Sequence, residues 1–226
     1  MTSNSFDPKQ LVAAFNRAAD TYDQALALPA EIGKRLLDRL DYIKVAPKTI
    51  LDLGSATGHQ TRALEKRYPK ANIIALDFAT NMLCKAKQQA RWFTHQHFLC
   101  ADATHIPLPD HSVDLIYSNL LLHWISDLPS LFSELARVLK PTGLLLFTSL
   151  GPDTLKELRQ SWASINNLPH VHSFLDMHDL GDGLLKFKFA DPIVDMEKIT
   201  LNYSTPDKLF KDLKSLGASN LALDRN

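Results

Sequence analysis

Apolar residues near the start of the chain recur every three or four positions, which is the spacing of a helix with one buried face. We therefore expect a helix from Pro8 to about Leu28 and a second from about Pro29 to Leu40. Both need a surface to cover, so residues 1–46 are interpreted as N-terminal cap helices. The apolar positions of the first helix are Leu11, Phe15, Ala18 and Tyr22.

Beyond residue 46 the pattern changes to short β-rich runs, most of them separated by connections long enough for a helix. Such alternation predicts a mostly parallel sheet with helices on both faces, an α/β fold. We interpret residues 47–150 as its core, within one domain that spans residues 1–226. The predicted strands are Thr49–Leu53, Asn72–Asp77, about His97–Cys100, Val113–Ser118 and Leu144–Ser149.

Lys140-Pro141-Thr142-Gly143 follows a strongly amphipathic helix and is expected to form a turn, since Pro cannot continue a helix and Gly tolerates a reversal. Residues 151–226 carry a different pattern, interpreted as substrate-side helices with one strand. The elements expected there are helices at about Asp153–Ile165, Asp176–Leu185 and Pro206–Leu216, and a strand near Ile193–Tyr203.

The composition narrows the function classes. The 226 residues are 45% hydrophobic and 22% charged, as in a globular chain, and 25 basic residues balance 25 acidic ones. A neutral chain has no broad attraction for nucleic acid or an anionic membrane. We find no secretory leader and no run of about 18 apolar residues. Cys84 and Cys100 are too few for a disulfide framework, so we expect a cytoplasmic protein without a metal site.

The sequence LDLGSATGHQT, residues 51–61, is the sharpest chemical feature. Small residues after an apolar strand let a ligand lie against the backbone at a helix N-terminus. A dinucleotide fingerprint needs glycines where Ala56 and His59 stand, which disfavours NAD. Asp52 would repel a pyrophosphate and suits a cationic ligand. The alternative is a tight turn without a ligand.

Three further strand ends carry polar residues. Asp77 could accept hydrogen bonds from both hydroxyls of a ribose, and alone it would be a surface residue. Asp102-Ala103 could frame a flat base, a weak signal in isolation. Asn119-Leu120 fits a turn as well as a substrate contact. Because parallel strands end at one edge of a sheet, the combination predicts a nucleoside site there.

LDLGSATG, Asp77, Asp102-Ala103 and LLFTSLGPDTL resemble class I S-adenosylmethionine-dependent methyltransferases, which have a Rossmann-like sheet. Residues 15–26, 118–162 and 174–203 are similar to the biotin-synthesis family of malonyl-acyl-carrier-protein O-methyltransferases, a similarity that covers about residues 11–218. It implies S-adenosylmethionine as cofactor, S-adenosylhomocysteine as product, and a malonyl thioester on an acyl carrier protein, or malonyl-CoA, as acceptor.

The resemblance also implies residue roles. The loop after the first strand would line the methionine end of the cofactor, and later strand ends would hold its ribose and adenine. Tyr22 matches the family's lid tyrosine and Arg17 its basic neighbour, while Ala56 stands where most relatives have glycine. The implied cofactor residues are Arg17, Tyr22, Asp52, Gly54, Ser55, Gly58, Asp77, Phe78, Met82, Asp102, Ala103, Asn119 and Leu120.

A malonyl carboxylate needs no general base, because carboxyl groups titrate near pH 4. A cation must still orient it. We favour Arg159 over Lys156, Arg17 or His178, because guanidinium binds carboxylate with two parallel bonds. Arg159 is therefore an expected catalytic residue, and Tyr22 is the second because the resemblance implies it. The alternative for Arg159 is a solvated helix face. His123 is interpreted as a packed residue.

Lys208, Lys211 and Lys214 recur every three residues and suggest a docking stripe for an acidic carrier protein, although most such stripes are simply solvated. We expect a monomer. Members of the family continue past residues 216–218 into a final strand, whereas this chain ends at Asn226, so we expect that strand to be missing and stability to be reduced. Rival interpretations are a methyltransferase for another acceptor and a non-catalytic binding protein.

Overall fold

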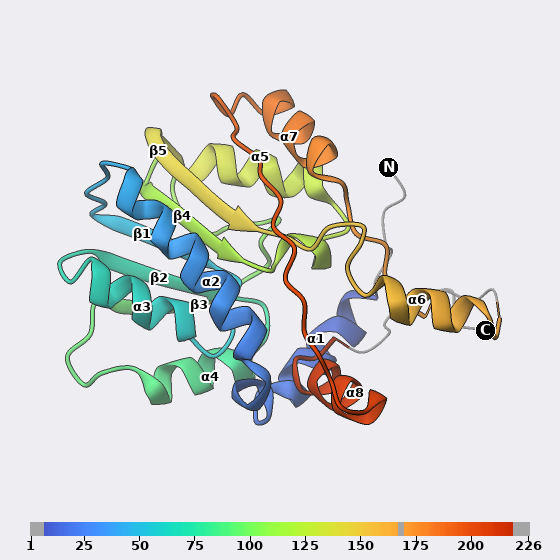
Figure 1. Ribbon diagram of the computed structural model, residues 1–226. Coiled ribbons are helices and arrows are strands. Elements are labelled where there is room, and N and C mark those ends of the chain that lie inside the picture. Colours follow the sequence, from blue (N-terminus) through green and yellow to red (C-terminus); the bar gives the residue numbers. More distant parts are fainter. Residues whose placement is uncertain (1–6, 167–169, 219–226) are drawn as a thin grey trace.

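The computed structural model describes residues 7–166 and 170–218. Five parallel strands form one sheet in the order β3-β2-β1-β4-β5 (Figure 1). The strands are β1 (Thr49–Leu53), β2 (Asn72–Asp77), β3 (Gln96–Cys100), β4 (Val113–Asn119) and β5 (Leu139–Thr148). The helices and 3-10 turns are α1 (Pro8–Ala18), η1 (Tyr22–Ala25), α2 (Ala27–Arg39), η2 (Leu40–Tyr42), α3 (His59–Arg67), α4 (Thr80–Gln89), η3 (Leu122–Trp124), α5 (Leu128–Val138), α6 (Lys156–Ala163), α7 (Met177–Lys186) and α8 (Pro206–Ser215).

The strand order reverses between β1 and β4. Chain order runs outward from β1 through β2 to β3, and then returns to β4 on the other side of β1. Such a switch point opens a crevice at the carboxyl ends of the central strands, where α/β sheets bind ligands. The five strands predicted from the alternating pattern are confirmed, and β5 begins five residues earlier than expected.

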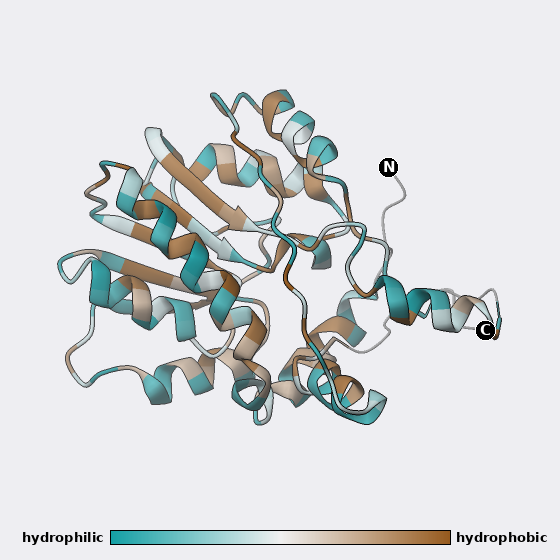
Figure 2. Cartoon of the chain, in the orientation of Figure 1, coloured by the Kyte–Doolittle hydropathy of each residue, from teal (hydrophilic) through white to brown (hydrophobic). Residues whose placement is uncertain are grey.

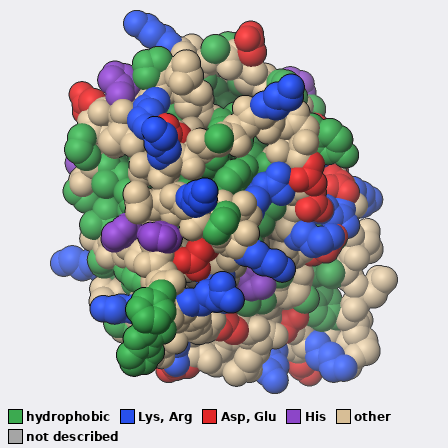
Figure 3. Space-filling model, turned by 90° about the vertical axis from the view of Figure 1, so that its left-hand side faces the viewer, with side chains coloured by type: hydrophobic (Ala, Val, Ile, Leu, Met, Phe, Trp, Pro, Cys, Tyr) green, Lys and Arg blue, Asp and Glu red, His purple; other side chains and the backbone are tan. Residues whose placement is uncertain are grey.

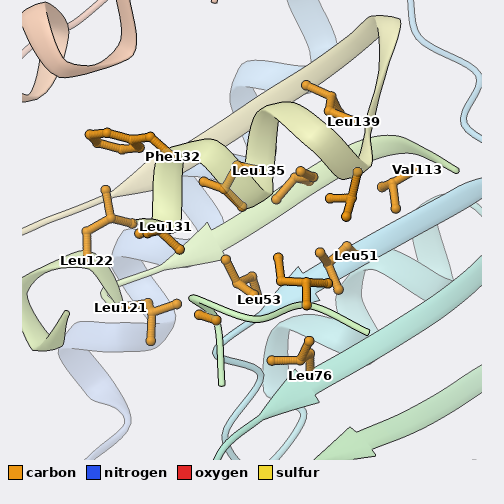
Figure 4. Close-up of a cluster of buried hydrophobic side chains, with 14 of the residues drawn as sticks. Leu51, Leu53, Leu76, Val113, Leu121, Leu122, Leu131, Phe132, Leu135 and Leu139 are labelled. Atoms are coloured by element: carbon orange, nitrogen blue, oxygen red, sulfur yellow. The ribbon is translucent and has the colours of Figure 1, made fainter. Parts of the chain in front are cut away.

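Side chains that alternate along β1 supply both faces of the sheet. Ile50 belongs to the apolar cluster that includes residues of α2 and α3, whereas Leu51 and Leu53 belong to the cluster formed with α5 and α7. Figure 4 shows Leu131 and Leu135 of α5 over the latter face. Figure 2 shows the hydrophobic strands enclosed by helices with hydrophilic outer sides. The helices therefore cover both faces, as the alternation predicts.

The predicted turn at residues 140–143 is wrong, since these residues lie within β5. Val113 pairs with Leu139 and Leu115 with Leu144, so four residues of β5 stand opposite Asp114 alone. The Lys140 ammonium donates to the Asp114 carboxylate at 2.6 Å and holds this bulge. The Pro-Gly signal thus produces an irregularity inside a strand.

The first predicted helix is too long. α1 ends at Ala18 because the amide and the hydroxyl of Thr21 both donate to the Ala18 carbonyl, at 2.9 and 3.2 Å, which closes the helix end. Tyr22 consequently lies in the separate turn η1, and α2 begins at Ala27.

The strand predicted at Ile193–Tyr203 is also wrong. This segment is extended but pairs with no strand, and it runs past α2 toward α8 (Figure 1). Glu197 accepts a hydrogen bond from Arg35, and Asp195 accepts one from Arg39 at 2.7 Å, both from α2. A helix has no free backbone ladder to pair with, so side-chain charges hold the segment.

The three helices expected after residue 151 are confirmed as α6, α7 and α8. Within the described ranges the sheet has no further strand, and the end of the chain, residues 219–226, lies outside them. No helix in the described part of the chain is long and apolar enough to cross a membrane. The proposed division at residues 46 and 150 stays a prediction.

Tyr117 of β4 ties the sheet to α2, because its buried hydroxyl donates to the Gly33 carbonyl at 2.8 Å. We expect Tyr117→Phe to lower the free energy of unfolding by about 1 kcal/mol, since a buried hydrogen bond to the helix is lost. Tyr42→Phe is the matched control, because Tyr42 is 89% exposed. Denaturant unfolding of both variants measures the difference, and equal stabilities would contradict the assignment.

Candidate active site

The loop of residues 54–58, called here the glycine-rich loop, joins β1 to α3 at the switch point. Gly54 and Gly58 have φ of +77° and +76°, the left-handed region that favours glycine. The amides of Gly54 and Ser55 donate to the Leu76 carbonyl at 2.9 and 3.0 Å. A Cβ at Gly58 would lie 2.9 Å from that of Ala86. The loop is thereby held tightly against β2 and α4.

Asp77, the last residue of β2, fixes this loop from the neighbouring strand. Its carboxylate accepts from the amides of Ala56 at 2.9 Å and Ala79 at 2.8 Å. Burial raises the pKa of Asp77 to about 6, although these backbone hydrogen bonds act in the opposite direction. Each oxygen keeps a second lone pair that can accept from a ligand hydroxyl.

Asp52 lies buried in β1, and the Thr61 hydroxyl donates to it. Burial raises the pKa of Asp52 to about 7; the charge of Asp77 raises it further and the Thr61 bond opposes the shift. In the described part of the chain, no Lys or Arg is among the groups that set either pKa. Two buried acids without a cation favour a positively charged ligand and disfavour a phosphate.

Ser55 presents a buried hydroxyl oxygen that has no hydrogen-bond partner among the described residues. Buried polar atoms are rarely left unpaired, and exceptions often mark a functional position. Together with the two carboxylates, this hydroxyl fits a ligand that carries both positive charge and hydrogen-bonding groups.

The N-terminal helices form a lid over the glycine-rich loop. The Thr57 hydroxyl donates to Asp23 of η1 at 2.6 Å. Phe15 of α1 packs edge-on against Phe78 at 5.4 Å and Trp124 at 5.3 Å between ring centroids. Spacing alone could not identify Asp23 as a residue of the lid, or Thr57 and Trp124 as its contacts, because the helical stripe marks only the buried face of α1.

Tyr22 packs against the apolar cluster of α1 and α4, which includes the fully buried Met82. Burial raises the pKa of Tyr22 well above its ordinary value, and the charges of Asp77 and Asp23 raise it further. Its phenol therefore stays protonated and can only donate to, or accept from, a neighbour without ionising. Arg17, by contrast, is exposed, and no hydrogen bond or ion pair joins it to another described residue.

The ends of β3 and β4 lie at the same sheet edge. Asp102 is exposed and accepts from the amide and hydroxyl of Thr104 at 2.8 and 2.9 Å, beside the buried Ala103. The Asn119 amide donates to the Pro29 carbonyl at 2.9 Å and accepts from Thr148. Both bonds join Asn119 to segments far along the chain and neither is to turn backbone, so its contact with a ligand stays a prediction. Leu120 follows with φ of +58°.

Arg159 of α6 is not on a solvated helix face. Its guanidinium donates to the carbonyls of Pro152 at 3.0 Å, Thr154 at 3.2 Å and His172 at 3.3 Å. These bonds leave two of its five N–H groups for another acceptor. The structure places Arg159 beside the loop that carries His172, whose ring lies 5.7 Å from that of Trp124.

His123 of η3 packs among aromatic rings, with Trp124 at 5.2 Å and Phe174 at 5.7 Å. Burial lowers the pKa of His123 to about 3, and His172 lowers it further, so its ring is neutral at physiological pH. The packed role predicted for His123 agrees with this position. His178 is bound to Asp176 at 2.6 Å on the exposed start of α7.

No group of three His, Cys, Asp or Glu side chains that could hold a metal ion occurs in residues 7–166 or 170–218. The expectation of a metal-free site stays a prediction. The roles assigned to individual site residues also stay predictions, although the structure brings the glycine-rich loop, Asp52, Asp77 and Tyr22 into one neighbourhood.

Ala56 has φ of +45°, a conformation that glycine adopts without strain. We expect Ala56→Gly to raise the free energy of unfolding by about 1 kcal/mol, since the left-handed strain of a non-glycine residue is removed. Ala63→Gly, inside α3, is the control and should cost about 1 kcal/mol. Thermal unfolding compares them, and destabilisation by both substitutions would refute the strain at Ala56.

Comparison with known proteins agrees with this geometry. Residues 51–147 match the family described as "Methyltransferase domain". The chain is 44% identical over 225 residues to a malonyl-[acyl-carrier protein] O-methyltransferase of Gallionella capsiferriformans, covering 97% of this chain and 78% of the relative. It is also 44% identical to malonyl-[acyl-carrier protein] O-methyltransferase 1 of Coxiella burnetii, covering 99% of this chain and 76% of that one.

Solved structures with the same fold include two methyltransferases. Phosphoethanolamine N-methyltransferase 2 of Haemonchus contortus, in complex with S-adenosylhomocysteine, is 25% identical with a TM-score of 0.55, covering 70% of this chain and 37% of that one. An S-adenosylmethionine-dependent methyltransferase of Mesorhizobium loti is 23% identical with a TM-score of 0.56, covering 70% and 80%.

The fold is that of class I S-adenosylmethionine-dependent methyltransferases, as the motifs predict. The identity over nearly the whole chain leads to one assignment. The chain belongs to the malonyl-[acyl-carrier protein] O-methyltransferase family.

Proposed function

We propose that this methyltransferase transfers the methyl group of S-adenosylmethionine to the free carboxylate of a malonyl thioester on an acyl carrier protein, a step of biotin synthesis. The identity of the cofactor is supported by the two buried carboxylates of Asp52 and Asp77, whose pKa values are set by no Lys or Arg in the described part of the chain. The shared name of the relatives supports the acceptor.

The residues at the switch point fit this cofactor. When bound, S-adenosylmethionine supplies a methyl group on a positively charged sulfur. Asp52 and Asp77 provide negative charge near that end of the site, and Asp77 keeps lone pairs for the two ribose hydroxyls. The unpartnered Ser55 hydroxyl would bind a polar group of the methionine moiety. Asp102 and Ala103 would frame the adenine.

The acceptor carboxylate is already ionised at neutral pH, so this chain need not remove a proton. Its task is to align the oxygen and to exclude water from it. The aromatic rings of Phe15, Trp124 and Phe174 supply apolar walls. We assign orientation of the carboxylate to the two remaining N–H groups of Arg159, and closure of the lid to Tyr22.

Cys84 and Cys100 are both free thiols on the surface. Exposed thiols persist in reducing compartments, which supports a cytoplasmic location. We infer that the protein works there as a monomer on a carrier-bound substrate, without nucleic acid or membrane partners.

The raised pKa values of Asp52 and Asp77 predict a pH-dependent cofactor affinity. A cationic ligand favours the ionised carboxylates, so binding releases protons, and affinity should rise from pH 5 to pH 8, by up to about tenfold per pH unit for each group that titrates. Without ligand the sign is opposite: the folded state holds these protons more tightly than the unfolded chain, so their contribution to stability falls as pH rises from about 4 to about 7.

Calorimetric titration with S-adenosylmethionine across this range measures the dependence. Asp52→Asn should flatten it, because one titrating group is removed. S-adenosylhomocysteine, which lacks the sulfonium charge, is the matched ligand and should show a shallower slope. Equal slopes for the two ligands would contradict the assigned charge pairing.

The proposed reaction is tested by incubating the protein with S-adenosylmethionine and malonyl acyl carrier protein. Mass spectrometry then shows whether the mass of the acyl chain has risen by one methylene. Arg159→Gln should lower kcat/KM for the acceptor by about 10- to 100-fold, because the carboxylate loses a charge-assisted hydrogen bond, while cofactor affinity is unchanged. Lys156→Gln, one turn earlier on α6, is the control and should retain activity. If activity is lost with Lys156→Gln and kept with Arg159→Gln, Lys156 and not Arg159 orients the carboxylate.

A further inference from the structure

α8 carries three lysines against two acids, Asp207 and Asp212, and so has a net positive charge. Lys208, Lys211 and Lys214 are all exposed on this helix, while Leu209, Leu213 and Ser215 lie toward the protein. Phe210 is 42% exposed and lies one helical turn before Lys214. We call Lys208, Phe210, Lys211 and Lys214 the α8 surface.

The lysines of the α8 surface have no acidic partner among the described residues. Some other basic side chains are paired, such as Lys85 with Asp20 and Arg67 with Asp41, each at 2.7 Å, whereas others, such as Lys66, are exposed and unpaired like those of α8. On α8 itself, Asp212 accepts from the Tyr203 hydroxyl at 3.2 Å. The three positive charges therefore remain available to a partner.

The α8 surface lies next to the lid. α8 packs against η1, the turn that carries Tyr22. Gly217, just after α8, lies against Phe15 and Ala18 of α1, where an added Cβ would be 3.4 Å from each side chain. Figure 1 shows α8 beside α1 at the end of the molecule toward which the strands point. A partner bound to α8 would thus be beside the entrance to the site.

We propose that the α8 surface is where the acidic acyl carrier protein docks, an inference that rests on the proposed function. Unpaired lysines attract an acidic partner and speed its encounter, and an exposed aromatic ring among them provides an apolar anchor. Docking here places the carrier next to the lid and leaves only its thioester arm to enter the crevice. Recognition of the carrier is thereby separated from the chemistry of the carboxylate.

The test replaces all three lysines with Glu, and in a second variant with Gln, which removes the charge without adding repulsion. KM for malonyl acyl carrier protein should rise by about tenfold or more with Glu and less with Gln, with kcat unchanged. KM for malonyl-CoA, which lacks the carrier, should stay within about twofold. A higher salt concentration should raise the KM of the wild-type protein for malonyl acyl carrier protein and change that of the Glu variant little.

The matched control reverses the charge of Lys66, Lys70 and Lys87, which are also exposed and form no ion pair with any described residue. Lys66 and Lys87 lie in the last turns of α3 and α4, and Lys70 lies in the loop before β2. All three are therefore near the amino ends of the strands, away from α8. Figure 3 shows that end of the molecule, where Lys and Arg are scattered among acidic side chains. This variant should use both acceptors normally.

Three results would overturn the docking site: an unchanged carrier KM in a Glu variant that unfolds at the wild-type temperature, an equal rise of KM for both acceptors, or an equal effect of the control variant. Binding of the carrier protein is also titrated directly. If neither acceptor is methylated, the proposed function fails, and the docking site is judged by whether the Glu variant loses carrier affinity. Binding of wild type to anionic vesicles but not to the carrier would refute it.

Discussion

The contact between Asp77 and the amides of Ala56 and Ala79 is the constraint on which the site depends. It fixes the glycine-rich loop that follows β1 to the end of β2, and so sets the conformation of the backbone at the switch point. The same contact holds a carboxylate where water is excluded and no described Lys or Arg sets its pKa. Structure and electrostatics are therefore determined together, because the backbone amides that position Asp77 also limit how far burial can raise its pKa.

The lid depends on this loop in turn. Asp23 binds Thr57 within the loop, and Phe15 packs on Phe78 directly after Asp77. The N-terminal helices are thus anchored to the residues proposed to hold the cofactor. Because of these contacts, the position of the lid depends on the conformation of the glycine-rich loop. The apolar stripe of α1 alone would pack on any surface of suitable shape.

The sequence predicts the core well, because burial on both faces gives β1, β2 and β4 their apolar character. It fails where the partner of a segment decides the outcome. Residues 193–203 have strand-like composition, but their neighbour is α2. The Pro-Gly signal at 140–143 is local, whereas pairing with β4 keeps these residues in a strand. The strand-end residues of the site could be predicted from topology, but the bond of Asn119 to Pro29 joins segments far apart in the chain. The carbonyls that bind Arg159 are closer in sequence, but they belong to loops whose shape no periodic pattern predicts.

A net charge of zero conceals a separation of charge that matters for the proposed reaction. Two buried carboxylates lie at the switch point, where burial magnifies their interaction with a cation, and unpaired lysines lie outside on α8, where salt screens them. The first arrangement selects a small ligand by charge at short range. The second can attract only a large acidic body at long range, since a small anion gains little from exposed lysines. The negative charges at the switch point and the positive charges on α8 lie on either side of the lid. This arrangement suits a cationic cofactor on the inner side and an anionic partner on the outer side, as the proposed function requires.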